Sequence, residues 1–216
     1  MLDPISKEVA AVLLQIKAIK LNAQTPFTWT SGMRSPIYCD NRTVLAFTEA
    51  RQKIKDLLIQ KAKIFSPFDA IAGVATAGIA WGAYIADDLE LPFCYVRSKP
   101  KEHGMQNLIE GQLLPNSTVL VIEDLISTGK SSIEASTHLQ EHGHQIAGVL
   151  SIFHYGFEET NQAFLNNNLK LESLCEFSSI LEQALLTNYI SQEDFNYLRS
   201  WNLNPKLWSQ NFINHN

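Results

Sequence analysis

The stretch VLVIEDLISTGKSS, residues 119–132, decides how the rest of the chain is interpreted. Its apolar first part, VLVIED at 119–124, is typical of a buried parallel strand and ends in the acidic pair Glu123 and Asp124. Small residues follow at 127–131, and a helix is predicted to begin there. A helix that starts at the carboxyl end of a parallel strand directs main-chain N–H groups and a partial positive charge at one point, which suits a phosphate. The two carboxylates can accept hydrogen bonds from neighbouring sugar hydroxyls, so this segment predicts a sugar-phosphate site.

Two other interpretations of the same segment compete with this one. The sequence TGKS is similar to the end of a Walker A loop, but that motif needs a glycine five positions before Gly129, where this chain has Asp124. A nucleoside triphosphatase is therefore disfavoured. A purely structural strand, turn and helix with incidental acids stays open, although buried carboxylates are costly unless they are used.

The remaining apolar runs alternate with predicted helices, which indicates βαβ units. The expected strands are residues 70–75, 93–97, 119–124 and 145–154, and the expected helices of the core are 78–87 and the segment after 130. The fold class is therefore predicted to be α/β, with a parallel central sheet flanked by helices.

Segments on both sides of this core are expected to decorate it within one domain, residues 1–216. Residues 1–48 should hold a helix over about 4–20, capped by Asp3, and a hood-like hairpin over 27–42. The α/β core spans 49–156 and opens with a helix capped by Thr48. Residues 157–216 should form a mainly helical extension, with helices at 178–188 and 191–201, the second capped by Ser191 with Asp194.

Composition narrows the function classes. The 216 residues are 45% hydrophobic and 18% charged, which is ordinary for a globular protein and unlike a disordered chain. The net charge of -5 disfavours a nucleic-acid partner, and no apolar run is long enough to span a membrane. The three cysteines lie far apart without a CxxC pair, so neither a disulfide framework nor a zinc site is expected, and a reducing cytoplasm fits best.

Two further segments stand out. The loop RSKPKEHG, residues 97–104, gathers three fixed cations and a histidine in an otherwise acidic chain, and a mobile basic loop of this kind can close over a polyanionic leaving group. A solvated run of charges remains the alternative for it. The segment SGMRSPIY, residues 31–38, together with Lys20, is able to shape a lid or a pocket wall, although alone it would indicate only a surface hairpin.

Together these three segments resemble the orotate phosphoribosyltransferases, which belong to the type I phosphoribosyltransferase superfamily. That family shows an SGxxSPxY segment near its N-terminus, a basic loop of the form RxKxKxHG, and a phosphoribosyl-pyrophosphate loop with an acidic pair. The chain matches these at 31–38, at 97–104 and at 123–131. The phosphoribosyl-pyrophosphate loop alone would indicate only the wider superfamily, and the combination is specific for the orotate branch.

The resemblance implies a reaction and its residues. Orotate would take the ribose 5-phosphate group from phosphoribosyl pyrophosphate (PRPP), giving orotidine 5'-monophosphate and pyrophosphate in pyrimidine biosynthesis. It implies catalytic roles for Arg97, Lys101, His103 and Asp124. It further implies that PRPP is bound by Arg97, Lys101, His103, Glu123, Asp124, Leu125, Ile126, Ser127, Thr128, Gly129, Lys130 and Ser131, and orotate by Ser127 and Lys20. Mg²⁺ is the implied cofactor, although no residue is assigned as its ligand, and the implied assembly is a homodimer whose basic loop reaches the partner's site.

Three positions depart from the family pattern. Ser98 stands where many members carry a second basic residue, and Ala77 stands where many have a lysine that contacts pyrophosphate. After the strand at 145–154 the chain has Tyr155 and Gly156, where some members bind orotate with an arginine. A purine-type phosphoribosyltransferase and a PRPP-sensing regulator that binds DNA or RNA are the alternatives that remain.

Overall fold

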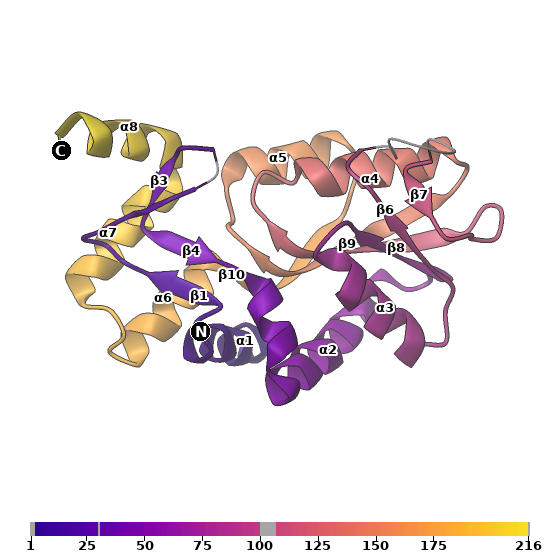
Figure 1. Ribbon diagram of the computed structural model, residues 1–216, viewed down its shortest axis with the longest axis horizontal. Helices are drawn as coiled ribbons and strands as arrows, with labels where there is room; N and C mark the ends of the chain where they lie inside the picture. Colours follow the sequence, from indigo (N-terminus) through magenta and orange to yellow (C-terminus); the bar gives the residue numbers. More distant parts are fainter. Residues whose placement is uncertain (1–2, 30, 100–106, 216) are drawn as a thin grey trace.

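A six-stranded sheet forms the centre of the computed structural model, which describes residues 3–29, 31–99 and 107–215 (Figure 1). The strand order is β10-β9-β8-β5-β6-β7. Neighbouring strands are parallel except for β7, which is antiparallel to β6. The strands are β5 (Ala70–Val74), β6 (Phe93–Val96), β7 (Ile109–Glu110), β8 (Thr118–Ile126), β9 (Gln145–His154) and β10 (Leu171–Glu176). The predicted α/β class with a parallel central sheet is confirmed.

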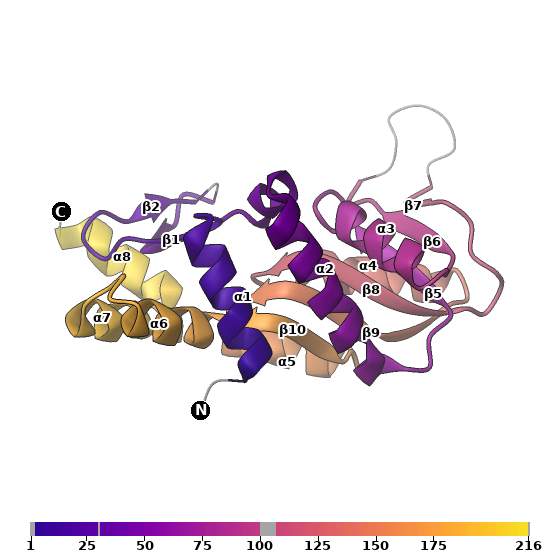
Figure 2. The ribbon, with the colours of Figure 1, turned by 90° about the horizontal axis from the view of Figure 1, so that it is seen from below.

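Helices cover both faces of this sheet (Figure 2). The helices of the described residues are α1 (Pro4–Gln15), α2 (Thr48–Ala62), α3 (Gly78–Asp88), α4 (Lys130–Glu141), α5 (Glu158–Asn166), α6 (Phe177–Leu186), α7 (Gln192–Leu203) and α8 (Pro205–His215). Helices α1, α2 and α3 lie on one face of the sheet and α4 and α5 on the other, whereas α7 packs against α6 and α8. Two 3₁₀ helices, η1 (Asn41–Ala46) and η2 (Lys63–Phe65), flank α2.

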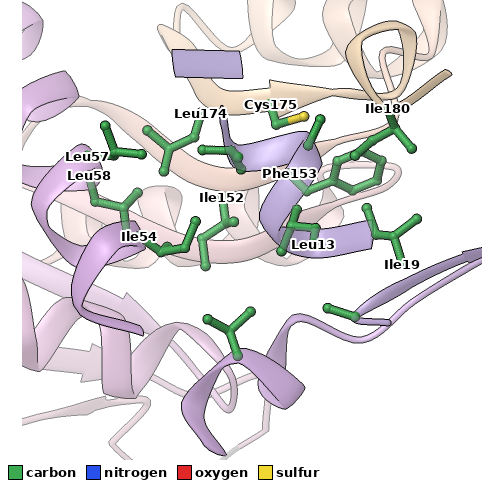
Figure 3. Packing of buried hydrophobic residues seen from close by; sticks show 14 of the residues in the cluster. Leu13, Ile19, Ile54, Leu57, Leu58, Ile152, Phe153, Leu174, Cys175 and Ile180 are labelled. Atoms are coloured by element: carbon green, nitrogen blue, oxygen red, sulfur yellow. The ribbon is translucent and has the colours of Figure 1, made fainter. Parts of the chain in front are cut away.

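Alternation along the central strand divides the core into two layers. Leu120 and Ile122 of β8 pack into the cluster that includes α1, α2, α3 and α6, whereas Val119 and Val121 pack into the cluster under α4 and α5. This period of two is the side-chain pattern of a strand that is buried on both faces. Figure 3 shows part of the larger layer, where Ile54 of α2 and Leu13 of α1 lie against Ile152 and Phe153 of β9.

The N-terminal segment forms a hood, which we define as residues 19–46. Within it β1 (Ile19–Leu21) pairs with β4 (Ile37–Cys39), and β2 (Phe27–Thr28) pairs with β3 (Arg34–Ser35), both antiparallel. The predicted hairpin around Ser31-Gly32 is thus confirmed for 27–35, although β4 leaves it to pair with β1. Figure 1 shows α7 and α8 beside the hood, and the main-chain N–H of Arg34 donates to Ser209 Oγ of α8 at 2.8 Å.

Several predicted boundaries are wrong. The first helix ends at Gln15 and not near residue 20, because Lys17 adopts a positive φ of 58° and the chain then enters β1. Thr48 is the first helical residue of α2, and Phe47 occupies the cap position. The extension after residue 157 holds helices α5 to α8 and, in addition, the strand β10, which was not predicted.

Two predicted helix caps are confirmed. Asp3 caps α1 by accepting from the N–H of Ser6, and Ser191 and Asp194 form a reciprocal capping box at α7. Within the described ranges no helix is both long and apolar enough to cross a lipid bilayer.

Candidate functional site

The site is built where four parallel strands end. The carboxyl ends of β5, β6, β8 and β9 lie at one edge of the sheet, joined by main-chain hydrogen bonds from Ala75 N to Val96 O (2.8 Å) and from Tyr155 N to Ile126 O (3.1 Å). The segments that follow these strands therefore meet at this edge, as open α/β sheets require of their ligand sites. They include the turn Ala75–Thr76, whose peptide bond is cis, the root of the basic loop at Arg97, and the turn after β8.

The acidic pair lies inside β8 and not at its end. The predicted strand end at Asp124 is wrong, because β8 continues to Ile126. In an extended strand neighbouring side chains take opposite faces. Accordingly Ser132 Oγ of α4 donates to Glu123 Oε2 at 3.5 Å. Asp124 instead interacts electrostatically with Arg42 and Asp40 of the hood. Both carboxyls are buried, with 7% and 9% of their surface exposed.

Burial makes this pair reluctant to ionise. The pKa of Glu123 is held well above its usual range, first by burial and then by the neighbouring charge of Asp124. Burial also raises the pKa of Asp124, and a hydrogen bond with the Glu123 carboxyl and then the guanidinium of Arg42 oppose that rise. Two adjacent carboxyls with raised pKa values at the ligand-binding edge of a sheet are typical of a functional site, because a structural role would not require them there.

The turn after β8 leads directly into α4. Gly129 occupies the cap position with a φ of 75°, and a Cβ at this position would collide with the ring of Phe164. Both facts restrict the position to glycine. Glycine offers no side-chain acceptor, so the first N–H groups of α4 remain available to an anion in front of the helix. This geometry is compatible with a phosphate at residues 127–131, and the role of these residues stays a prediction.

The basic loop is described only at its root. Arg97 is half-buried; its N–H donates to Leu108 O at 2.8 Å and its Nη1 lies 3.5 Å from Glu110 Oε1. Arg97 and Ser131 line the same small cavity of about 10 Å³, so the structure brings the loop root next to the phosphate turn. Lys101 and His103 lie outside the described residues, and their predicted roles stay predictions.

Lys20 is placed in the hood. It lies on β1 opposite Tyr38 of β4, and its Nζ stands 5.9 Å from the centroid of the Tyr38 ring. Its predicted contact with orotate stays a prediction. Ala77, which departs from the family pattern, occupies the cap position of α3, directly after the turn at the end of β5.

Two buried residues that sequence analysis did not single out touch the site. Asn41 Nδ2 donates to the main-chain carbonyl of Asp124 at 2.7 Å, and Thr160 Oγ1 donates to that of Ser127 at 2.6 Å. They lie 83 and 33 residues from their acceptors. No local pattern in the sequence marks such partners.

Comparisons with known proteins agree with this geometry. The family model described as a phosphoribosyl transferase domain matches residues 43–160. An orotate phosphoribosyltransferase of Porphyromonas gingivalis is 46% identical over 94% of this chain and 98% of its own length. The corresponding protein of Cytophaga hutchinsonii is 47% identical over 95% and 99%.

Solved structures extend the likeness. A crystal structure of orotate phosphoribosyltransferase from Aeropyrum pernix has a TM-score of 0.74 and 28% identity, and the match covers 85% of this chain and 99% of that one. One from Mycobacterium tuberculosis, solved with PRPP, shares the fold at 20% identity with a TM-score of 0.64, over 82% of this chain and 99% of that one. The central sheet is thus that of the type I phosphoribosyltransferases, and the chain belongs to the orotate phosphoribosyltransferase family.

Proposed function

We propose that this protein transfers the ribose 5-phosphate group of PRPP to N1 of orotate, releasing pyrophosphate and forming orotidine 5'-monophosphate for pyrimidine biosynthesis. The observation that carries the proposal is the pairing of two buried carboxyls on β8 with the glycine-capped start of α4, in a chain of this family. One end of this segment suits ribose hydroxyls and the other suits the 5'-phosphate.

Each part of the site then has a task. Glu123 and Asp124 accept hydrogen bonds from the ribose hydroxyls, and residues 125–131 surround the 5'-phosphate. Ser127 and Lys20 contact orotate. Arg97, Lys101 and His103 bind the departing pyrophosphate, where positive charge stabilises the transition state as the bond to C1 breaks. Lys99 is available to compensate for Ser98.

We further propose that Mg²⁺ is required. This ion usually binds through one or two carboxylates together with substrate phosphates, and the diphosphate of PRPP supplies such phosphates. When bound it would neutralise charge on the pyrophosphate. Because the ribose occupies Glu123 and Asp124 in this scheme, we expect the ion to enter with PRPP.

The assembly and the compartment are also proposals. We propose a homodimer in which the loop 97–104 of one subunit completes the site of the other. A reducing compartment, the cytoplasm, suits the three unpaired cysteines, two of which are buried. The acidic net charge of -5 supports neither DNA nor RNA as a partner.

The test is an absorbance assay of the purified protein with PRPP and Mg²⁺. We expect PRPP-dependent loss of orotate absorbance and no reaction with hypoxanthine or uracil. Turnover of hypoxanthine would instead assign a purine-type enzyme. PRPP binding without turnover of any base would assign the protein to the sensing regulators.

A further inference from the structure

Four residues of the site, Asp124 to Ser127, lie where the sheet no longer supports them on both sides. The pairing of β8 with β5 runs to Gly73 opposite Ile122, so Asp124 lies beyond it. The pairing with β9 runs to Ile126 opposite His154, so Ser127 lies beyond that as well. Yet this is the segment that carries a buried carboxyl and the start of the phosphate turn.

Side chains from two distant elements hold the two ends of this segment. Asn41 of η1, in the hood, donates to the carbonyl of Asp124, and Thr160 of α5 donates to the carbonyl of Ser127 (2.7 and 2.6 Å). Both donors are almost fully buried, at 0% and 1% exposure. A buried carbonyl that loses its donor carries the full cost of desolvation, so each bond restrains the main chain strongly.

The location of the donors gives the bonds a purpose beyond stability. Asn41 also accepts from the thiol of Cys39 at the end of β4 (3.4 Å), which ties it to the hood strands. Thr160 lies on the same helix as Phe164, whose ring packs under Gly129. The hood and α5 therefore hold the same four residues from two directions.

We propose that Asn41 and Thr160 are positioning residues for the PRPP site. They fix the main chain at both ends of the segment 124–127, so that the carboxyl of Asp124 and the start of the phosphate turn take the geometry that PRPP binding needs. Small displacements of such groups reduce rates greatly, because binding and reaction depend on alignment. This inference rests on the proposed function for the identity of the ligand.

The chain offers a control for each residue, in a less buried position. Thr187 Oγ1, directly after α6, donates to Gln183 O at 2.9 Å, and Asn202 Nδ2 of α7 donates to Tyr155 O at 2.8 Å. The control variants Thr187→Val and Asn202→Ala remove the same kinds of bond from other acceptors. Thr160→Val keeps the shape of the side chain and removes the donor, Thr160→Ser restores the donor, and Asn41→Ala removes the amide.

The experiment measures PRPP affinity by calorimetry and the KM for PRPP in the orotate assay, beside the melting temperature of each variant. We expect Thr160→Val and Asn41→Ala each to weaken PRPP binding about three- to tenfold, the effect of losing one neutral hydrogen bond. The controls should bind PRPP as the wild type does, even where their melting temperatures fall. Thr160→Ser should restore most of the affinity.

Other results would overturn the inference. If Thr160→Val and Asn41→Ala bind PRPP as tightly as the wild type, or lose no more affinity than their controls, the two bonds serve only the fold. Equal loss in Thr160→Ser and Thr160→Val would have the same meaning. Failure of the proposed function gives a different result, because the wild type would then bind PRPP without consuming orotate. The PRPP affinities of the variants would still test the inference.

Discussion

At the scale of single residues, Glu123 and Asp124 are a cost to the fold. Both pKa values are raised by burial, so the folded state holds protons more tightly than the unfolded chain. The stability that this contributes is present below the unfolded pKa values and is lost as the pH rises through the folded ones. Wherever the pair is ionised it therefore opposes folding, and ligand hydroxyls that bind the carboxylates relieve the cost.

Asp124→Asn should separate the two effects. We expect PRPP affinity to fall about ten- to a hundredfold, since a hydrogen bond to a charged group contributes about 1.5–3 kcal/mol. The melting temperature at pH 8 should rise above that of the wild type, because a buried charge is removed, and the difference should shrink toward pH 4. Calorimetry with PRPP and thermal unfolding at both pH values check this.

Added Mg²⁺ provides the control for this variant. If the carboxylate binds sugar hydroxyls, more Mg²⁺ should not restore affinity. Recovery at high Mg²⁺, or tight binding of the ion to the wild type without PRPP, would instead assign Asp124 to the metal.

His154 is a second buried group with a shifted pKa. It ends β9, its Nε2 is buried without a hydrogen-bond partner in the described part of the chain, and burial lowers its pKa to about 4. A lowered pKa means that stability is complete above the unfolded pKa of about 6.5 and is lost as the pH falls toward the folded value.

His154→Gln should therefore flatten the acid side of the stability profile. Between pH 7.5 and 5.0 the wild type should lose about 2 kcal/mol more free energy of unfolding than the variant, from 1.36 kcal/mol per pH unit below 6.5. Urea unfolding at both pH values measures it. The acidic pair contributes with the opposite sign but equally in both proteins, so identical slopes would show that His154 takes up a proton in the folded state.

At the scale of elements, the sequence pattern predicted those strands and helices whose signals are contiguous in the chain. The β8 segment was predictable because an uninterrupted apolar run and a small-residue turn are contiguous in the sequence. The strand β10 was not, since LESLCE is short and half polar, and it becomes a strand by pairing with β9. The end of α1 was missed for the same reason, because pairing of β1 with β4 overrides apolar spacing that continues past Gln15.

The same division applies to the site. The acidic pair and the phosphate turn are adjacent in sequence and were predicted with their roles. Asn41 and Thr160 reach the site only through tertiary packing, so their spacing in the chain carries no signal. The sequence also does not show whether the adjacent carboxyls lie on the same face, because this depends on the residue at which β8 ends.

The turn between β8 and α4 can be tested with a pair of glycines. Gly129→Ala meets both a positive φ and the ring of Phe164, whereas Gly143→Ala meets a positive φ of 85° and open space. We expect Gly143→Ala to cost about 1–2 kcal/mol of unfolding free energy and to leave PRPP binding unchanged. Gly129→Ala should cost more and weaken PRPP binding at least tenfold. If the two variants had equal effects on unfolding free energy and on PRPP binding, the ring of Phe164 would have moved aside freely.

At the scale of the whole molecule, an aromatic cluster joins three parts of the chain. Trp29 of the hood packs edge-on against Trp201 of α7 with ring centroids 6.0 Å apart, and Tyr155, directly after β9, lies 5.3 Å from Trp29 and 5.9 Å from Trp201. The C-terminal helices thereby support the hood, which in turn reaches the site through Asn41. The strand β6, which the basic loop follows in the sequence, lies away from the hood in Figure 2.

This separation leads to a prediction about assembly. If the loop serves the partner's site, a subunit that lacks Lys101 and a subunit that lacks Asp124 each remove a different half of every site. Lys101→Ala alone should lower kcat, because losing one preorganised charge raises the activation free energy by about 3–4 kcal/mol. Asp124→Asn alone should be impaired through its roughly ten- to hundredfold weaker PRPP binding. In a heterodimer of the two variants, one site has both defects and the other has none. Mixing equal amounts should therefore recover about a quarter of wild-type activity per subunit when subunits exchange statistically.

Subunit exchange is verified independently by mass spectrometry of the mixed dimers. Exchange without recovery would mean that each chain builds its own site, with the loop folding back over its own PRPP turn.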